Sequence, residues 1–146
     1  MKKLFIYYSK GGNGDIVADE YKKNGYEVIK LINKHNLPKN LFMQMMIGGM
    51  FSFFHHKASL VKSEFDLSEF EEIVVGTPIW NGLGSTPFNT FVKKNKLNDN
   101  VSFVAYAGGG EAPKFEAYIN KHYPKSKVII LREPKKNPDE LKKLIF

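Results

Sequence analysis

The sequence predicts an α/β fold: a three-layer α/β/α sandwich whose parallel sheet has five strands in the order 2-1-3-4-5. Short apolar runs typical of buried strands alternate with segments whose apolar residues recur at helical spacing. Three of these runs end in a loop that contains glycine. No internal repeat or low-complexity tract divides the 146 residues, so we expect one domain over residues 1–146.

The predicted strands are short apolar runs rich in β-branched and aromatic residues. They are residues 3–8, 26–32, 72–76, 101–106 and 127–131. The first run has apolar residues on both faces, as in a strand buried between two helical layers. Regular alternation with helices specifies a parallel sheet with right-handed crossovers.

Four segments are predicted helices because each carries a start or stop signal or an apolar stripe. These features are Asp15 and Asn24-Gly25 for the first, Ser85 or Thr86 before Pro87 for the second, Phe115, Tyr118, Ile119 and His122 for the third, and Asn137-Pro138-Asp139-Glu140 for the last. Residues 36–63 have no clear period. We expect a loop there, with one apolar helix between residues 41 and 54.

Composition excludes several kinds of chemistry. The chain has no cysteine, which rules out disulfides, thiolate nucleophiles and metal sites held by sulfur, so any redox chemistry must come from a bound cofactor. The net charge is +7, but Arg132 is the only arginine, and arginine is the side chain that favours bidentate phosphate and base recognition. We expect a lysine-rich solvated surface and no nucleic-acid partner.

The sequence also lacks the usual signals for export or membrane insertion. The apolar run at residues 4–8 is too short for the hydrophobic region of a signal peptide. The densest apolar stretch, residues 41–54, is interrupted by polar residues and glycines and falls short of the ~20 residues that span a bilayer. We therefore expect a cytoplasmic protein without a membrane partner.

The glycine-bearing loops predict a binding site. They follow the first, third and fourth strands, which are neighbours in the predicted order, so the loops should meet at the carboxyl edge of the sheet. Backbone amides of the first loop, at the start of the next helix, would form an anion cradle. A dinucleotide fingerprint would need glycine at Val17, and the Walker spacing is absent, so a mononucleotide phosphate is predicted.

Other kinds of site are not indicated. The four histidines lack the carboxylate spacing of a metal site, and no Gly-x-Ser-x-Gly elbow occurs. We predict neither a metal site nor a catalytic side chain.

Three motifs follow the first, third and fourth predicted strands. They are Tyr8-Ser9-Lys10-Gly11-Gly12-Asn13-Gly14, Gly76-Thr77-Pro78-Ile79-Trp80-Asn81-Gly82 and Ala107-Gly108-Gly109-Gly110. With these motifs the sequence resembles the flavodoxins and flavodoxin-like proteins over essentially its whole length. The resemblance implies the flavodoxin-like fold, FMN as the cofactor and an electron-transfer function.

The resemblance also implies which residues bind the cofactor. The phosphate loop would be Ser9, Lys10, Gly11, Gly12, Asn13 and Gly14; the isoalloxazine and the rest of the pocket would be bordered by Thr77, Pro78, Ile79, Trp80, Asn81, Gly82, Ala107, Gly108, Gly109 and Gly110. The family's phosphate loop usually reads Ser/Thr-x-Thr-Gly-x-Thr. Here Gly11 and Gly14 stand at the two later threonine positions, so two hydroxyl donors are missing.

Three functions are compatible with these features, because a fold alone does not select one. The favoured function is an FMN-binding electron carrier. The alternatives are an FMN-dependent NAD(P)H:quinone-type oxidoreductase and a cofactor-poor binding module of the same fold. Flavodoxins usually carry an acidic surface, whereas this chain is basic, so we expect an acidic redox partner.

Overall fold

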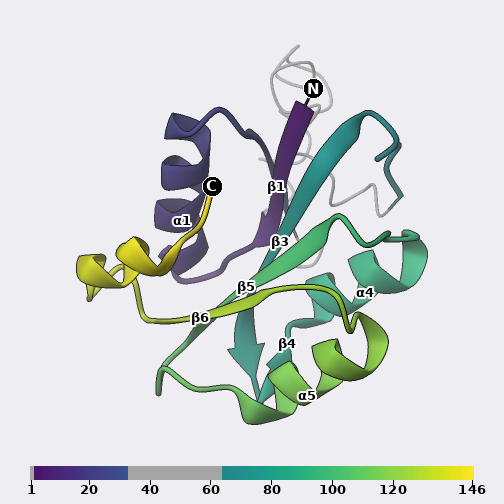
Figure 1. Ribbon diagram of the computed structural model, residues 1–146. Coiled ribbons are helices and arrows are strands. Elements are labelled where there is room, and N and C mark those ends of the chain that lie inside the picture. Colours follow the sequence, from purple (N-terminus) through teal and green to yellow (C-terminus); the bar gives the residue numbers. More distant parts are fainter. Residues whose placement is uncertain (1, 33–63) are drawn as a thin grey trace, which may run out of the picture.

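The computed structural model describes residues 2–32 and 64–146, which form an α/β structure around a six-stranded sheet (Figure 1). In chain order the elements are β1 (Lys2–Tyr8), α1 (Asn13–Lys23), β2 (Glu27–Leu31), β3 (Phe70–Trp80), β4 (Leu83–Gly84), α4 (Thr86–Lys94), β5 (Val101–Ala107), α5 (Pro113–His122), β6 (Val128–Arg132) and the 3₁₀ helix η2 (Pro138–Lys143). The loop and helix expected within residues 36–63 lie outside the described residues.

The strand order confirms the predicted topology. The sheet runs β2-β1-β3-β5-β6 with every neighbouring pair parallel, and β4 pairs only with β3, antiparallel to it. Without β4, this order is 2-1-3-4-5. The first, third and fourth of the five parallel strands are therefore neighbours, as the binding-site prediction requires.

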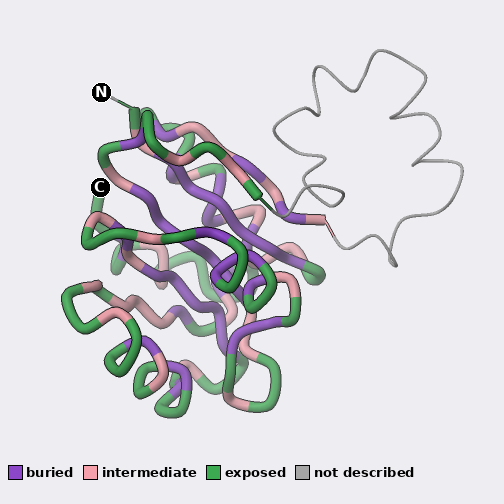
Figure 2. Tube along the Cα trace, turned by 90° about the vertical axis from the view of Figure 1, so that its right-hand side faces the viewer, coloured by how far each residue is buried: buried purple, intermediate pink, exposed green. Residues whose placement is uncertain are grey.

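Two hydrophobic cores cover the two faces of the sheet, because alternate residues of each strand point to opposite sides. On β1, Phe5 and Tyr7 join a core with α1 and the C-terminal segment, whereas Leu4 and Ile6 join a core with α4 and α5. Figure 1 shows α1 and η2 on one side of the sheet and α4 and α5 on the other. Figure 2 shows buried residues concentrated along the strands between these layers.

The last element differs from the predicted helix. Residues 138–143 form a 3₁₀ helix, and Asn137, which was expected to cap it, makes no side-chain cap hydrogen bond. The Asn137 amide instead donates to the carbonyls of Arg132 and Glu133, at 3.1 and 3.3 Å. The asparagine therefore closes the turn after β6 rather than starting an α-helix.

The second predicted loop is also partly regular structure. β3 continues to Trp80, because Thr77 and Pro78 still pair with Ala105 and Tyr106 of β5. Asn81 and Gly82 then take φ values of 53° and 81° and turn the chain into β4. Two consecutive left-handed residues form the type of turn that asparagine–glycine favours in hairpins.

Among the described residues, no helix is both long and apolar enough to cross a membrane. In the same part of the chain, no three histidine or carboxylate side chains gather into a group that could hold a metal ion.

Candidate functional site

The loops after β1, β3 and β5 meet at one edge of the sheet. These strands are adjacent and parallel, so their carboxyl ends lie side by side. The ring of Trp80 from the second loop meets Tyr8 of β1 edge to face, with ring centroids 5.7 Å apart. The Tyr106 hydroxyl on β5 donates to the carbonyl of Tyr8. Side chains thus tie the three strand ends together.

The first loop presents the N-terminus of α1 with a glycine at the N-cap position. Gly12 is the N-cap residue, with φ of 90°, a value that residues other than glycine rarely adopt. Glycine has no side chain that could cap the helix, and in the first turn the Gly14 amide donates to Ser9 Oγ at 3.0 Å. The partial positive charge of a helix N-terminus favours an anion at this position.

Gly11 and Gly14 occupy different environments. A Cβ at Gly11 would meet no atom within 4 Å, and its φ lies outside the left-handed range. A Cβ at Gly14 would lie 2.5 Å from Tyr106 Oη and 2.6 Å from Ser9 Cβ. Gly14 is therefore required for packing, whereas Gly11 is open.

A buried pair of hydroxyl groups connects the second loop to the start of α4. Thr77 Oγ1 lies 3.0 Å from Ser85 Oγ and accepts from the Ser85 amide at 3.0 Å. Ser85, one of the two residues predicted for this position, is the N-cap of α4, and its Oγ accepts from the Phe88 amide. Both hydroxyl residues are fully buried. The Thr77 side chain thus joins the hairpin to α4.

The tip of the second loop is open to solvent. Trp80 is 38% exposed and Leu83, across the hairpin, is 45% exposed. The third loop is open as well: Gly108 and Gly109 are exposed, and a Cβ at either glycine would meet nothing within 4 Å. A partly exposed tryptophan at the same sheet edge as open glycines offers a surface on which an aromatic ring can stack.

Three basic residues that sequence reasoning missed line these loops. Each lies against a glycine with positive φ. The nearest atom to a Cβ built on Gly12 belongs to Lys135, at 3.3 Å. The corresponding neighbours are Lys114 for Gly82, at 3.1 Å, and Arg132 for Gly110, at 3.2 Å. Arg132 ends β6 and Lys135 follows it, so the position of β6 at the same sheet edge was the available signal. Lys114, in the first turn of α5, had no comparable signal.

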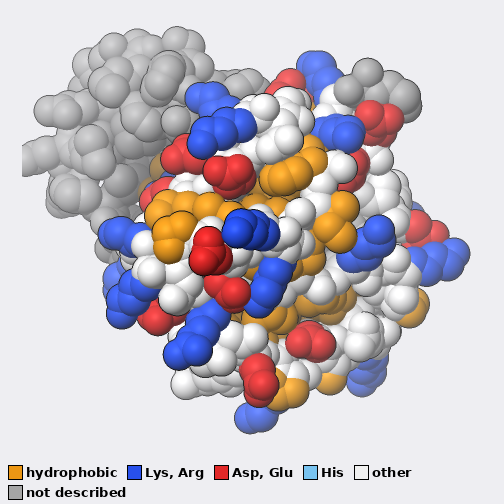
Figure 3. All heavy atoms as spheres, turned by 60° about the vertical axis from the view of Figure 1, so that its left-hand side comes forward, with side chains coloured by type: hydrophobic (Ala, Val, Ile, Leu, Met, Phe, Trp, Pro, Cys, Tyr) orange, Lys and Arg blue, Asp and Glu red, His pale blue; other side chains and the backbone are white. Residues whose placement is uncertain are grey.

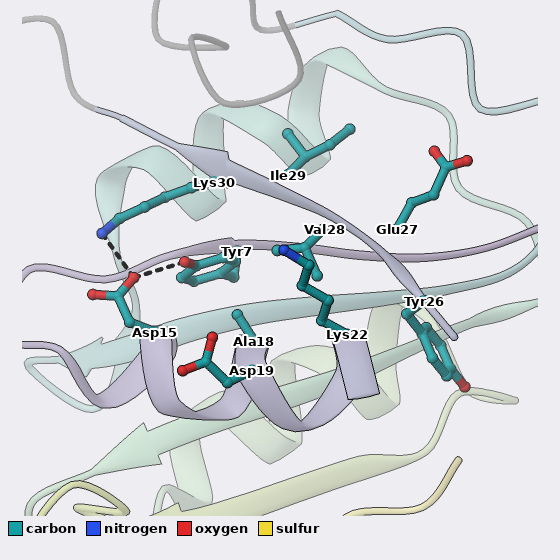
Figure 4. A pocket seen from close by; sticks show the side chains of 10 residues that line it. All are labelled: Tyr7, Asp15, Ala18, Asp19, Lys22, Tyr26, Glu27, Val28, Ile29 and Lys30. Carbon is teal, nitrogen blue, oxygen red and sulfur yellow. Dashed lines mark hydrogen bonds and ion pairs between the residues drawn. The ribbon is translucent and has the colours of Figure 1, made fainter. Parts of the chain in front are cut away.

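A separate cavity of about 590 Å³ lies between α1 and β2 (Figure 4). Two of its charged groups pair with each other, since Asp15 Oδ1 accepts from Lys30 Nζ at 2.8 Å, and the same oxygen accepts from Tyr7 Oη at 2.6 Å. Burial, followed by the bond to Asp15, raises the pKa of Tyr7 well above its usual value. No predicted site residue lines this cavity, so the three loops remain the candidate site.

No family model and no curated protein sequence matches the chain. Solved structures do match it. A protein from Bacteroides eggerthii, provisionally classed as a flavoprotein, is 17% identical with a TM-score of 0.63, covering 94% of each chain. A flavoprotein from Lactobacillus acidophilus, crystallised with FMN, is 16% identical with a TM-score of 0.57, covering 94% of this chain and 97% of that one.

A flavodoxin, WrbA-like protein from Agrobacterium tumefaciens is 12% identical with a TM-score of 0.53, and the match covers 97% of this chain and 88% of that chain. The chain has the flavodoxin-like fold. In this flavodoxin-like chain, the three loops stand at the carboxyl edge of the sheet, where open α/β sheets bind their ligands. At these levels of identity the comparisons describe the fold, and the residues of the site must support any function.

Proposed function

We propose that this flavodoxin-like chain binds FMN at the three loops and serves as an electron carrier. The observation that carries the proposal is the meeting of a helix N-terminus with glycine at its N-cap, an exposed tryptophan and an open glycine loop at one sheet edge. A fold neighbour crystallised with FMN supports the choice of cofactor. Bound FMN would supply the redox chemistry, which no side chain of a cysteine-free protein provides.

The residues fit a flavin mononucleotide in two places. The first turn of α1 offers backbone amides to a single phosphate group, and Gly11 leaves open space beside them. The exposed face of Trp80 offers a stacking surface for the isoalloxazine ring. One anion cradle suits one phosphate, which favours FMN over a dinucleotide.

The site favours an electron carrier that exchanges electrons at an exposed edge. Trp80 and Leu83 make this edge apolar, while Lys114 and Arg132 lie against the glycines of the second and third loops. Basic groups around an apolar contact favour an acidic redox partner, which is the partner we propose. The cytoplasm is the compartment we propose for this exchange.

Absorbance spectra of the purified protein, recorded before and after addition of FMN and removal of free flavin, test the proposal. We expect a flavin spectrum after addition, and slow oxidation of NADH and NADPH by the loaded protein. Rapid oxidation of either nucleotide would show that the protein is a reductase rather than a carrier. A protein that stays colourless would be a binding module instead.

A further inference from the structure

The turn after β6 places one lysine over the first turn of α1. The Lys135 amide donates to Asn13 Oδ1 at 3.0 Å, so the backbone of the turn is docked on the first residue of the helix. A Cβ on Gly12 would lie 3.3 Å from both Cδ and Nζ of Lys135. The ammonium group therefore lies beside the α-carbon of the N-cap residue.

The position of this turn is fixed from several sides. The amides of Lys136 and Asn137 both donate to the carbonyl of Glu133, at 2.9 Å. Asn137 bonds back to the same carbonyl through its side chain, and Glu140 Oε1 accepts from the Arg132 amide at 2.7 Å. A turn closed by these bonds and docked on Asn13 holds the Lys135 backbone against α1.

Lys135 differs from the other lysines of the C-terminal segment in its ionic contacts. Lys136, Lys142 and Lys143 each lie within 4 Å of a carboxylate three residues away, at 3.6, 3.6 and 2.9 Å. Within residues 2–32 and 64–146, no carboxylate lies within that distance of Lys135 Nζ. Its ammonium lies beside the positive end of α1, which repels it, and an anion between them would offset this repulsion.

We infer that Lys135 is a phosphate-binding residue of this chain: it pairs with the phosphate monoester of FMN and takes the place of the hydroxyl donors missing at Gly11 and Gly14. The inference rests on the proposed function. A lysine ammonium forms charge-assisted hydrogen bonds with phosphate oxygens. In this role Lys135 makes the site select FMN over riboflavin, which has the same ring system but no phosphate.

Lys135→Met tests the inference, because methionine keeps an aliphatic stem over Gly12 and the backbone bond to Asn13 while removing the charge. Lys136→Met is the matched control: it removes the same charge from the next residue, whose ammonium is paired with Glu133. Lys135→Arg restores a cation. Titrations of each protein with FMN and with riboflavin give the ratio of the two affinities, which isolates the contribution of the phosphate.

We expect Lys135→Met to weaken FMN about tenfold, the low end for a charge-assisted bond at an exposed site, and to leave riboflavin unchanged. Lys136→Met should behave as the unaltered protein and Lys135→Arg should retain most of the FMN affinity. Equal FMN affinities in the two methionine variants would overturn the inference. So would equal losses of FMN and riboflavin in Lys135→Met, which would show a general disturbance of the pocket.

A titration with inorganic phosphate separates this inference from the proposed function. Amide chemical shifts of Gly12 and Asn13, followed by NMR, should move with phosphate in the unaltered protein and in Lys136→Met, and much less in Lys135→Met. If these shifts appear but neither flavin binds, the proposed function fails and the phosphate site stands. If FMN binds and the shifts are the same in all three proteins, Lys135 has no role in holding the phosphate.

Discussion

Gly14 is enclosed by the side chains of Tyr106, Ser9 and Tyr7, and each would lie within 2.8 Å of an added Cβ. Two of these neighbours are themselves fixed: Ser9 accepts from the Gly14 amide, and Tyr106 bonds to the carbonyl of Tyr8. A side chain at this position would push the start of α1 away from the sheet. The first loop can pack closely against the sheet because Gly14 has no Cβ.

Gly14→Ala should therefore destabilise the protein by about 1–3 kcal/mol, the usual cost of overpacking. Gly11→Ala, in open space, is the control and should leave the stability unchanged within about 0.5 kcal/mol. Denaturant unfolding of both variants measures the difference. Equal stabilities would contradict the packing described for Gly14.

Gly11→Thr should tighten FMN binding without a loss of stability, because it restores a hydroxyl beside the phosphate site at an unstrained position. One hydrogen bond to a charged group corresponds to roughly tenfold in affinity or more. Calorimetric titration with FMN measures this gain. An unchanged affinity, in a variant with an unchanged melting temperature, would show that backbone amides and Lys135 suffice.

Tyr106 links two strand ends through its hydroxyl, and burial raises its pKa. Tyr106→Phe removes this hydrogen bond and should therefore lower the free energy of unfolding by about 1 kcal/mol at pH 7. A raised pKa in the folded state means that stability is present below the ordinary tyrosine value near 10 and is lost as the pH rises above it. The phenylalanine variant should lose less stability than the unaltered protein between pH 9 and about 11, as thermal unfolding would show.

The turns and caps show which elements the sequence could predict. The strands and their order followed from apolar runs and alternation, and Ser85 was one of the two residues predicted to cap α4. The hairpin at Asn81-Gly82 was missed because residues 77–84 were interpreted as an irregular loop, although asparagine–glycine between apolar residues is a turn signal. Asn137 was misassigned because the same side chain can cap a helix or close the preceding turn.

The site could be predicted as far as strand ends determine it. The three loops followed from the topology. Lys114 and Lys135 lie beside glycines that are distant in sequence, and such contacts depend on tertiary packing, which periodicity does not encode.

Glu140 connects η2 to β6, since its carboxylate accepts from Lys143 Nζ at 2.9 Å and from the Arg132 amide. The bond to Lys143 contributes most, and together these bonds lower the pKa of Glu140. A lowered pKa means that the contribution to stability is present above the ordinary glutamate value near 4.3 and is lost as the pH falls through the folded-state value.

Glu140→Gln should therefore lower the melting temperature at neutral pH, and the difference from the unaltered protein should shrink as the pH falls to about 3. Asp139→Asn is the control, because Asp139 pairs with Lys142 at the surface. A difference that is constant across this range would show that the charge of Glu140 is not what stabilises η2.

Charged side chains are distributed differently on two parts of the surface. On the face that carries α1 and the C-terminal segment, basic and acidic side chains are intermixed, with apolar groups between them (Figure 3). The lysines there are largely a solvated surface rather than one positive patch. At the three loops, by contrast, Lys114, Arg132 and Lys135 lie against glycine backbone. We expect the excess of positive charge to act at this edge.

Oxidation of the FMN-loaded, reduced protein by a small acceptor tests this arrangement. The rate with anionic ferricyanide should fall as salt is added, since exposed charges are screened over ~10 Å at 0.1 M ionic strength. With a cationic cobalt(III) complex the rate should rise instead. Lys114→Met should reduce both salt dependences, and rates independent of salt would show that the basic residues do not steer the partner.

Trp80 is the only tryptophan in the chain, and it stands in the second loop, so its fluorescence reports directly on the proposed site. The most direct test is a titration with FMN that follows this emission. The proposed site predicts saturable quenching at one FMN per chain, with FAD much weaker. FMN binding that leaves the Trp80 emission unchanged, or no binding at all, would contradict the proposal.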